Sequence, residues 1–256
     1  MRWINFSVLA FVLLAACSGR DTVNNEPIIC LTIDDGDKSI YTAAYPILKE
    51  YGYTATTFVN TGKIGRSNHL SWNDLLNLKE DDWETGGHTV NHANLPDLDD
   101  AEALWEITAD YDSLCAHGFD PLSFALPSGH ATQRDFCIIA GLYRNIRNSR
   151  DMTHHQPIDR LNIGYFFVQS DYAVDDIFNR IWQGTINNEA LIVIGFHRFR
   201  NQADGYPANC SPEVFEQFVS KLREHDFNVM TFNNAVDKLT GANMNRNLPD
   251  ITGLEP

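Results

Sequence analysis

The alternation of strand-like and helix-like segments is the feature that most constrains how this chain can fold. Short apolar, β-branched segments are separated by segments whose apolar residues recur at helical spacing. The predicted strands are residues 28–33, 54–60, 83–86, 122–126, 143–147, 161–168, 191–196 and 228–232. The main predicted helices are residues 39–51, 132–141 and 174–183, with others beginning at Ser71, Asp99 and Ser211. Such alternation implies a mostly parallel sheet with helices outside it.

Seven or eight strands in a chain of 256 residues fit a single (β/α) barrel, complete or incomplete. An open doubly wound sheet is the alternative, but no Gly-x-Gly-x-x-Gly follows the first strand. In barrels of this kind the chemistry lies at the carboxyl ends of the strands. Asp34, Asp35, Ser128 and His197 all fall at such ends.

The N-terminal residues 1–17 are predicted to be an export signal. Arg2 gives a positive start, and the apolar run 6–16 is too short to span a bilayer. The run ends in small residues before Cys17, which resembles a bacterial lipoprotein box with a lipidated cysteine. A secretory signal cut near Ala16, or an uncleaved anchor, is the alternative. We therefore expect an exported lipoprotein of the bacterial cell envelope that touches a membrane only through its lipid.

The rest of the chain divides simply. Residues 18–26 are polar and predict a tether, 27–240 form the (β/α) domain, and 241–256 predict a loose tail. The formal net charge of −15 argues against nucleic acid as a partner. Export permits disulfides. The spacing of the four cysteines after Cys17 selects none of their three pairings.

The stretch Leu31–Gly36 reads Leu-Thr-Ile-Asp-Asp-Gly, so a buried strand runs directly into two carboxylates. Neighbouring side chains of an extended chain point apart, so one Asp can hold a cation while the other faces a substrate. Gly36 permits a sharp turn just after them. An ordinary strand-to-loop exit is the alternative, because Asp and Gly are common turn residues.

Two histidine motifs are also candidates for a metal site or an acid–base residue. His88 and His92 are four residues apart, a spacing that places both on one face of a helical turn, where they can converge on one metal ion. His197 ends the apolar strand 191–196 and is suited to act as a general acid or base. The alternatives are surface histidines and a hydrogen-bonded histidine at the rim.

In order and spacing, these motifs resemble those of the polysaccharide deacetylases, carbohydrate esterase family four. The similarity extends over about residues 28–239 and includes Tyr45–Gly52 and the Trp-Glu-x-Gly at 83–86. The resemblance implies a distorted (β/α) barrel with about seven strands and a hydrolase that removes acetyl groups from an N-acetylated amino-sugar polysaccharide. It also implies one divalent metal ion, usually zinc, with cobalt or nickel as alternatives.

The same resemblance implies the role of each site residue. Asp35, His88 and His92 would bind the metal, and metal-bound water would be the nucleophile. Asp34 would be the general base and His197 the general acid, while a backbone N–H near Ser128 would stabilise the oxyanion.

The chain departs from the family pattern at its third motif. The family usually has Arg-x-Pro followed by an aromatic residue, whereas residues 125–129 read Ala-Leu-Pro-Ser-Gly. The arginine that orients the catalytic Asp is therefore missing. Arg160 is a candidate to replace it, unless it is a solvated surface residue. Asp171 is the nearest candidate to pair with His197.

Two other functions remain open. The chain could instead be an esterase that removes O-acetyl groups from xylan or a similar glycan, using the same metal site. It could also be a catalytically silent lipoprotein that only binds glycan, which the altered third motif suggests. The complete set of base, acid and metal ligands argues against a silent protein.

Overall fold

The computed structural model describes residues 26–201 and 205–241. The predicted signal with Cys17, most of the tether and most of the tail lie outside these residues. None of the helices in the described ranges is long and apolar enough to cross a membrane.

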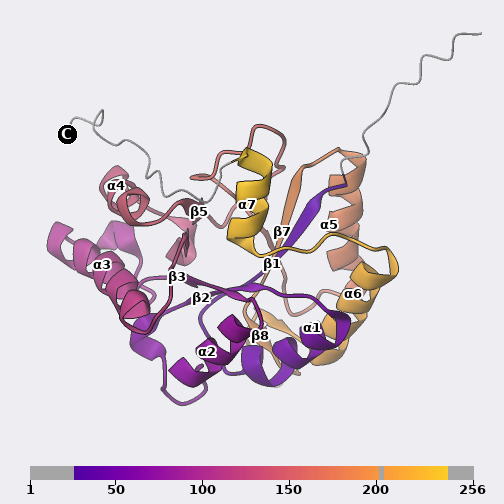
Figure 1. The fold of residues 1–256 in the computed structure, drawn as a ribbon, viewed down its shortest axis with the longest axis horizontal. Helices are drawn as coiled ribbons and strands as arrows, with labels where there is room; N and C mark the ends of the chain where they lie inside the picture. Colours follow the sequence, from indigo (N-terminus) through magenta and orange to yellow (C-terminus); the bar gives the residue numbers. More distant parts are fainter. Residues whose placement is uncertain (1–25, 202–204, 242–256) are drawn as a thin grey trace, which may run out of the picture.

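Seven parallel strands form one curled sheet in the order β5-β4-β3-β2-β1-β7-β6 (Figure 1). The strands are β1 (Ile28–Ile33), β2 (Thr56–Val59), β3 (Glu84–Gly87), β4 (Ser123–Ala125), β5 (Asn145–Arg147), β6 (Phe166–Phe167) and β7 (Leu191–Phe196). A separate pair consists of β8 (Arg198–Phe199) and β9 (Asn209–Cys210). The predicted single, distorted (β/α) barrel is confirmed.

The segment predicted as one strand over residues 161–168 joins the two edges of the sheet. Ile163 forms a parallel bridge with Arg147 of β5. Further along, Phe166 and Phe167 pair with Ile194 and Gly195 of β7. Only two of its residues therefore form β6, because the chain crosses from β5 to β7 within a few residues.

Among the described residues, seven helices pack on this sheet, six of them outside it (Figure 1). They are α1 (Tyr45–Tyr51), α2 (Trp72–Glu80), α3 (Asp100–Ala116), α4 (Gln133–Leu142), α5 (Val174–Ile186), α6 (Pro212–Glu224) and α7 (Phe232–Thr240). A π-helical turn, Ile40–Ala44, precedes α1. The helix starts predicted at Ser71 and Asp99 are confirmed, since both residues are N-caps, and Glu102 completes a capping box with Asp99. These caps satisfy backbone N–H groups that would otherwise lack partners at the helix starts.

The predicted last strand, residues 228–232, is wrong. Only Val229 pairs with the sheet, through a bridge to Ile29, and the helix α7 begins at Phe232. Phe232, Ala235 and Val236 lie at helical spacing and pack against Ile28 and the other inward-facing side chains. This helix therefore fills the sheet interior from the amino-terminal end of β1.

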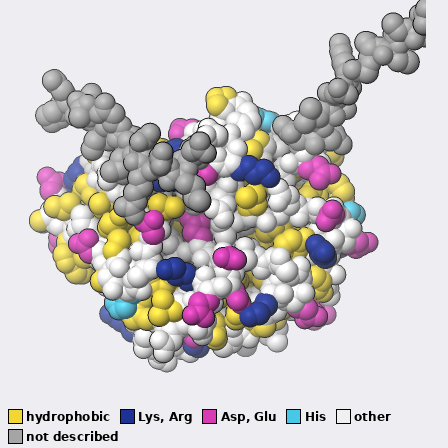
Figure 2. All heavy atoms as spheres, in the orientation of Figure 1, with side chains coloured by type: hydrophobic (Ala, Val, Ile, Leu, Met, Phe, Trp, Pro, Cys, Tyr) yellow, Lys and Arg dark blue, Asp and Glu magenta, His cyan; other side chains and the backbone are white. Residues whose placement is uncertain are grey.

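β1 is buried along its whole length and separates two parts of the core. Ile29, Leu31 and Ile33 pack toward the outer helices, while Ile28 and Cys30 face the interior. The cysteines at 30, 115, 137 and 210 are all unpaired. Acidic side chains are spread over the face drawn in Figure 2, with individual Lys and Arg side chains between them, in keeping with the net charge of −15.

Candidate active site

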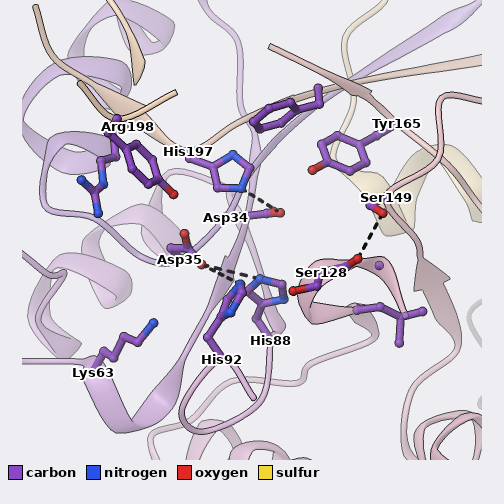
Figure 3. Close-up of a pocket in the computed structure, with 14 residues that line it drawn as sticks. Asp34, Asp35, Lys63, His88, His92, Ser128, Ser149, Tyr165, His197 and Arg198 are labelled. Carbon is purple, nitrogen blue, oxygen red and sulfur yellow. Dashed lines mark hydrogen bonds and ion pairs between the residues drawn. The ribbon is translucent and has the colours of Figure 1, made fainter. Parts of the chain in front are cut away.

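A cavity of about 510 Å³ opens at the carboxyl ends of the strands. Its wall contains the four residues predicted at strand ends together with the two loop histidines (Figure 3). The lining residues are Asp34, Asp35, Lys63, His88, His92, Leu126, Ser128, Gly129, Ser149, Tyr165, Phe167, His197, Arg198 and Tyr206. Asp171 and Arg160, two further sequence candidates, do not line it.

The two adjacent carboxylates leave β1 in different directions. Asp34 still continues the strand, because its N–H donates to the carbonyl of Phe196 on β7 at 3.0 Å. Asp35 and Gly36 then adopt left-handed backbone conformations, with φ of 71° and 69°. Asp tolerates this region better than most residues and Gly favours it. As a result Asp34 is buried at 3 % exposure, while Asp35 turns toward the histidines.

Asp35, His88 and His92 place one potential ligand atom each within 4.8 Å of the others. The Nε2 atoms of His88 and His92 lie 3.7 and 3.4 Å from Oδ1 of Asp35. That oxygen is buried and has no hydrogen-bond partner among the described residues. A carboxylate oxygen left without a partner between two imidazole nitrogens fits a divalent cation.

The tautomer of His88 also suits a metal ligand. Its Nδ1 lies 2.7 Å from the carbonyl oxygen of Ala125, which can only accept, so Nδ1 carries the hydrogen. The lone pair of Nε2 therefore faces Asp35. Burial is the main cause that lowers the pKa of His88, to about 4, although Asp34 and Asp35 oppose it. The imidazole is thus neutral near pH 7, as metal binding requires.

The histidine pair is not on a helical turn, which corrects the reason given for its spacing. Residues 88–92 form a loop after β3, and Thr89 and His92 have φ of 63° and 62°. A left-handed conformation is costly for a β-branched residue. The oxygen Oγ1 of the fully buried Thr89 accepts a hydrogen bond from the N–H of Ala93 at 3.1 Å, which helps to hold this turn. The convergence of the rings comes from this loop and not from helical periodicity.

Buried polar side chains support the loop from behind. Glu106 of α3 accepts hydrogen bonds from the backbone N–H and the side-chain amide of Asn91, at 2.9 and 2.7 Å. Asp110, one helical turn later, accepts from the N–H of His88 at 3.1 Å. Asn60 donates to the carbonyl of His88 at 2.6 Å. The two acids of α3 therefore position the loop that carries His88 and His92.

Asp34 is held by Arg147, the last residue of β5. Nη2 of Arg147 donates to Oδ2 of Asp34 at 2.5 Å. The guanidinium is 1 % exposed and lies over the rings of Tyr165 and Phe58, at 4.0 and 5.2 Å from their centres. A planar, stacked guanidinium fixes a carboxylate in one orientation. Arg147 therefore supplies the orienting arginine that residues 125–129 lack.

Arg160 does not orient Asp34. Its Nη2 donates to Asp237 and to the hydroxyl of Thr240, at 3.1 and 2.7 Å, which ties it to α7. The sequence predicted a strand ending at Arg147 but did not single this residue out. An arginine at the carboxyl end of a parallel strand was the available signal, because such an end opens on the site.

The environment of Asp34 keeps it ionised. Burial is the largest single influence and would raise the pKa of this carboxyl, but the charges of Arg147, His197 and His88 and the hydrogen bond from Arg147 together outweigh it. The net effect is a pKa below the ordinary value. The second oxygen, Oδ1, is buried and accepts no hydrogen bond from the described residues. An ionised carboxylate with a free oxygen can accept a proton from a water molecule.

His197 faces the same oxygen of Asp34 that Arg147 contacts. Its Nε2 is 3.8 Å from Oδ2 of Asp34, and its ring meets the edge of Phe167 at 5.1 Å. Burial is the main cause that lowers its pKa, while Asp34 opposes the shift. Nδ1 has no hydrogen-bond partner in the described part of the chain. The expected pairing with Asp171 is therefore corrected, and Asp171 is exposed to solvent.

Ser128 lies at the edge of the cavity in a left-handed turn, with φ of 55°. Together with Asp35, Thr89 and His92 it makes four of the eight described non-glycine residues with positive φ. Strained backbone of this kind concentrates at functional sites. The sequence did not point to Lys63, Tyr165, Arg198 or Tyr206, which also line the cavity.

Comparisons with known proteins agree with the arrangement. The family model described as polysaccharide deacetylase matches residues 21–139. The putative polysaccharide deacetylase YxkH of Bacillus subtilis is 33% identical over 79 residues, which are 31% of this chain and 28% of that protein. The poly-beta-1,6-N-acetyl-D-glucosamine N-deacetylase of Staphylococcus aureus (strain MRSA252) is 38% identical over 74 residues, or 26% of this chain and 25% of that protein. The chain thus aligns with about a quarter of each relative.

Two solved structures share the fold. One is the Xyl-CE4 domain of a multidomain xylanase from the hindgut metagenome of Trinervitermes trinervoides, with a TM-score of 0.58 and 17% identity. The match covers 85% of this chain and 93% of that one. The other is the peptidoglycan deacetylase PdaC of Bacillus subtilis, with a TM-score of 0.55, 19% identity, and coverage of 86% and 95%. Identities this low show the fold alone.

Proposed function

We propose that this chain, which belongs to the polysaccharide deacetylase family, is a metal-dependent hydrolase that removes acetyl groups from an N-acetylated amino-sugar polysaccharide. One observation carries the proposal. The buried carboxylate of Asp34, held by Arg147, shares a cavity with His197 and with the three potential metal ligands. A protein that only binds glycan would not need this combination.

Asp35, His88 and His92 would hold one divalent ion. Two imidazoles and one carboxylate suit zinc, and cobalt and nickel accept the same donors. When bound, such an ion makes water acidic and polarises an acetyl carbonyl. The unpartnered Oδ1 of Asp35 is the direct structural support for this assignment.

Asp34 would take a proton from the attacking water. Its lowered pKa keeps it ionised, and Arg147 prevents it from rotating away. His197 would donate a proton to the leaving nitrogen, which is a poor leaving group while it remains unprotonated. The backbone N–H near Ser128 would stabilise the oxyanion, which agrees with the strained turn at the cavity edge.

The substrate class rests on the relatives. One relative bears the name poly-beta-1,6-N-acetyl-D-glucosamine N-deacetylase, so an N-acetylglucosamine polymer is the first candidate. Removal of O-acetyl groups from xylan or another glycan is the second. The lowered pKa of His197 favours it, because an alcohol leaves with less help from an acid than an amine does.

Acetate release tests both candidates. The purified chain is offered N-acetylglucosamine oligomers and acetylated xylan, each with zinc or cobalt, and released acetate is measured. We expect release from the oligomers to exceed release from xylan. Release from xylan alone would favour the esterase, and release from neither would leave a silent binding protein.

We also propose that Cys17 is lipidated and anchors the domain at the cell envelope, facing the periplasm or the surface. The support is the short apolar run that ends in small residues before Cys17. Expression of the full chain and of Cys17→Ser in a bacterium, with metabolic labelling by a fatty acid, tests this. Label should appear in the unchanged chain only, and equal label in both would contradict the anchor.

A further inference from the structure

Tyr165 is firmly positioned in the cavity wall beside the proposed base. Its ring lies 4.0 Å from the guanidinium carbon of Arg147 and meets Phe167 edge-on at 6.3 Å. It packs so closely on β7 that any side chain at Gly195 would overlap the ring. The residue is only 7 % exposed, yet it lines the cavity. This environment fixes the ring and leaves its hydroxyl at a defined point.

The hydroxyl of Tyr165 points into the cavity beside Asp34 (Figure 3). Its side-chain hydrogen-bond partner is Arg147. Arg147 can only donate, so it cannot use the phenolic proton. Burial raises the pKa of Tyr165 to about 12, with the carboxylates Asp34 and Asp35 adding to the rise and Arg147 opposing it. The phenol is therefore neutral and keeps a proton to donate.

The direction of the hydroxyl restricts what it can meet. In Figure 3 Asp35, His88 and His92 lie on one side of Asp34, with the Ser128 side chain beside His88, and Tyr165 and Ser149 lie on the other side. An acetyl group must approach the metal ligands and Asp34. The rest of its sugar then has room on the side of Tyr165 and Ser149, whose side-chain hydroxyls line the wall.

We propose that Tyr165 contacts the substrate, its hydroxyl donating a hydrogen bond to a free ring hydroxyl of the sugar that carries the acetyl group. This inference rests on the proposed function and extends it, since it makes Tyr165 a residue that selects the sugar. No proton is transferred in this contact. The ligand class is a pyranose with an unmodified hydroxyl near its acetylated position.

Tyr165→Phe removes the hydroxyl and keeps the ring over Arg147. We expect kcat/KM for N-acetylglucosamine oligomers to fall about tenfold, mainly through KM, because one hydrogen bond is lost. Hydrolysis of 4-nitrophenyl acetate, which has no sugar, should change less than twofold. Tyr172→Phe is the matched control, since its hydroxyl contacts Gln169 and lies outside the cavity.

Two results would overturn the inference. An unchanged kcat/KM for the oligomers in Tyr165→Phe would show that the hydroxyl does not contact the sugar. Equal losses on the oligomers and on 4-nitrophenyl acetate would show that it acts only by supporting Arg147. Failure of the proposed function looks different, because the unchanged chain would then release no acetate. In that case, calorimetric binding of the oligomers to the unchanged chain and to Tyr165→Phe still tests the contact.

Discussion

Arg147→Met removes the guanidinium that holds Asp34 and keeps an unbranched side chain of similar length. The pair is buried, with Arg147 and Asp34 at 1 % and 3 % exposure, so solvent cannot replace the lost charge. Removing one partner of a buried ion pair costs about 3–5 kcal/mol of unfolding free energy. The variant should therefore lose roughly this much in denaturant titrations.

The same substitution should change the pH dependence of turnover. In the unchanged chain the pKa of Asp34 lies below 3.8, so the pair stabilises the fold at neutral pH and this stabilisation is lost as pH falls through that lowered value. Without Arg147, burial dominates and raises the pKa. The acidic limb of the acetate-release profile should then move to higher pH, and turnover at pH 7 should fall about 100-fold or more.

Arg160→Met is the matched control for this prediction. Arg160 is also paired with a carboxylate, but it contacts Asp237 and Thr240 near the end of α7. Arg160→Met should leave the acidic limb of the acetate-release profile unchanged. It should lower the free energy of unfolding by about 1 kcal/mol at most, because the pair of Arg160 with Asp237 is partly exposed. Full turnover with an unshifted limb in Arg147→Met would refute the assignment of Arg147 as the residue that orients Asp34.

Three further predictions test the surroundings of the site. His88→Ala should reduce bound metal, measured by elemental analysis, at least tenfold, and equal metal in both proteins would exclude the site. Glu106→Gln should weaken metal binding about tenfold in a competition titration, because glutamine offers one acceptor oxygen in place of the two that hold Asn91; an unchanged affinity would show that the loop needs no such support. Burial raises the pKa of Asp110 to about 7, so its folded state keeps a proton that the unfolded chain loses near pH 3.8. As the pH rises from about 3.8 to about 7, the unfolding free energy of the metal-free chain should therefore fall by up to about 4 kcal/mol relative to that of Asp110→Asn. Parallel stability curves of the two proteins would contradict this.

Much of the fold follows from local sequence patterns. β1 and β7 were predicted with their observed ends, because each is a long apolar run that stops at a charged or polar residue. The helix α7 was not predicted, since Phe232 and its neighbours also fit a strand. Its helical state depends on the space inside the sheet, which only the tertiary structure defines.

The site was harder to predict where it depends on contacts between distant residues. Asp34, Asp35, His88, His92 and His197 are brought together as the motif order suggested. Arg147 is 113 positions from Asp34, and no local pattern links the two. The contact exists because the carboxyl ends of β1 and β5 open on the same cavity.

The most direct test of the central claim is a zinc titration of the chelator-treated chain, with bound metal and acetate release from N-acetylglucosamine oligomers followed together. The unchanged chain should bind one ion and gain activity in proportion to the bound metal. Asp34→Asn should bind one ion as well, yet release almost no acetate. Acetate release without metal, or full activity of Asp34→Asn, would contradict the account.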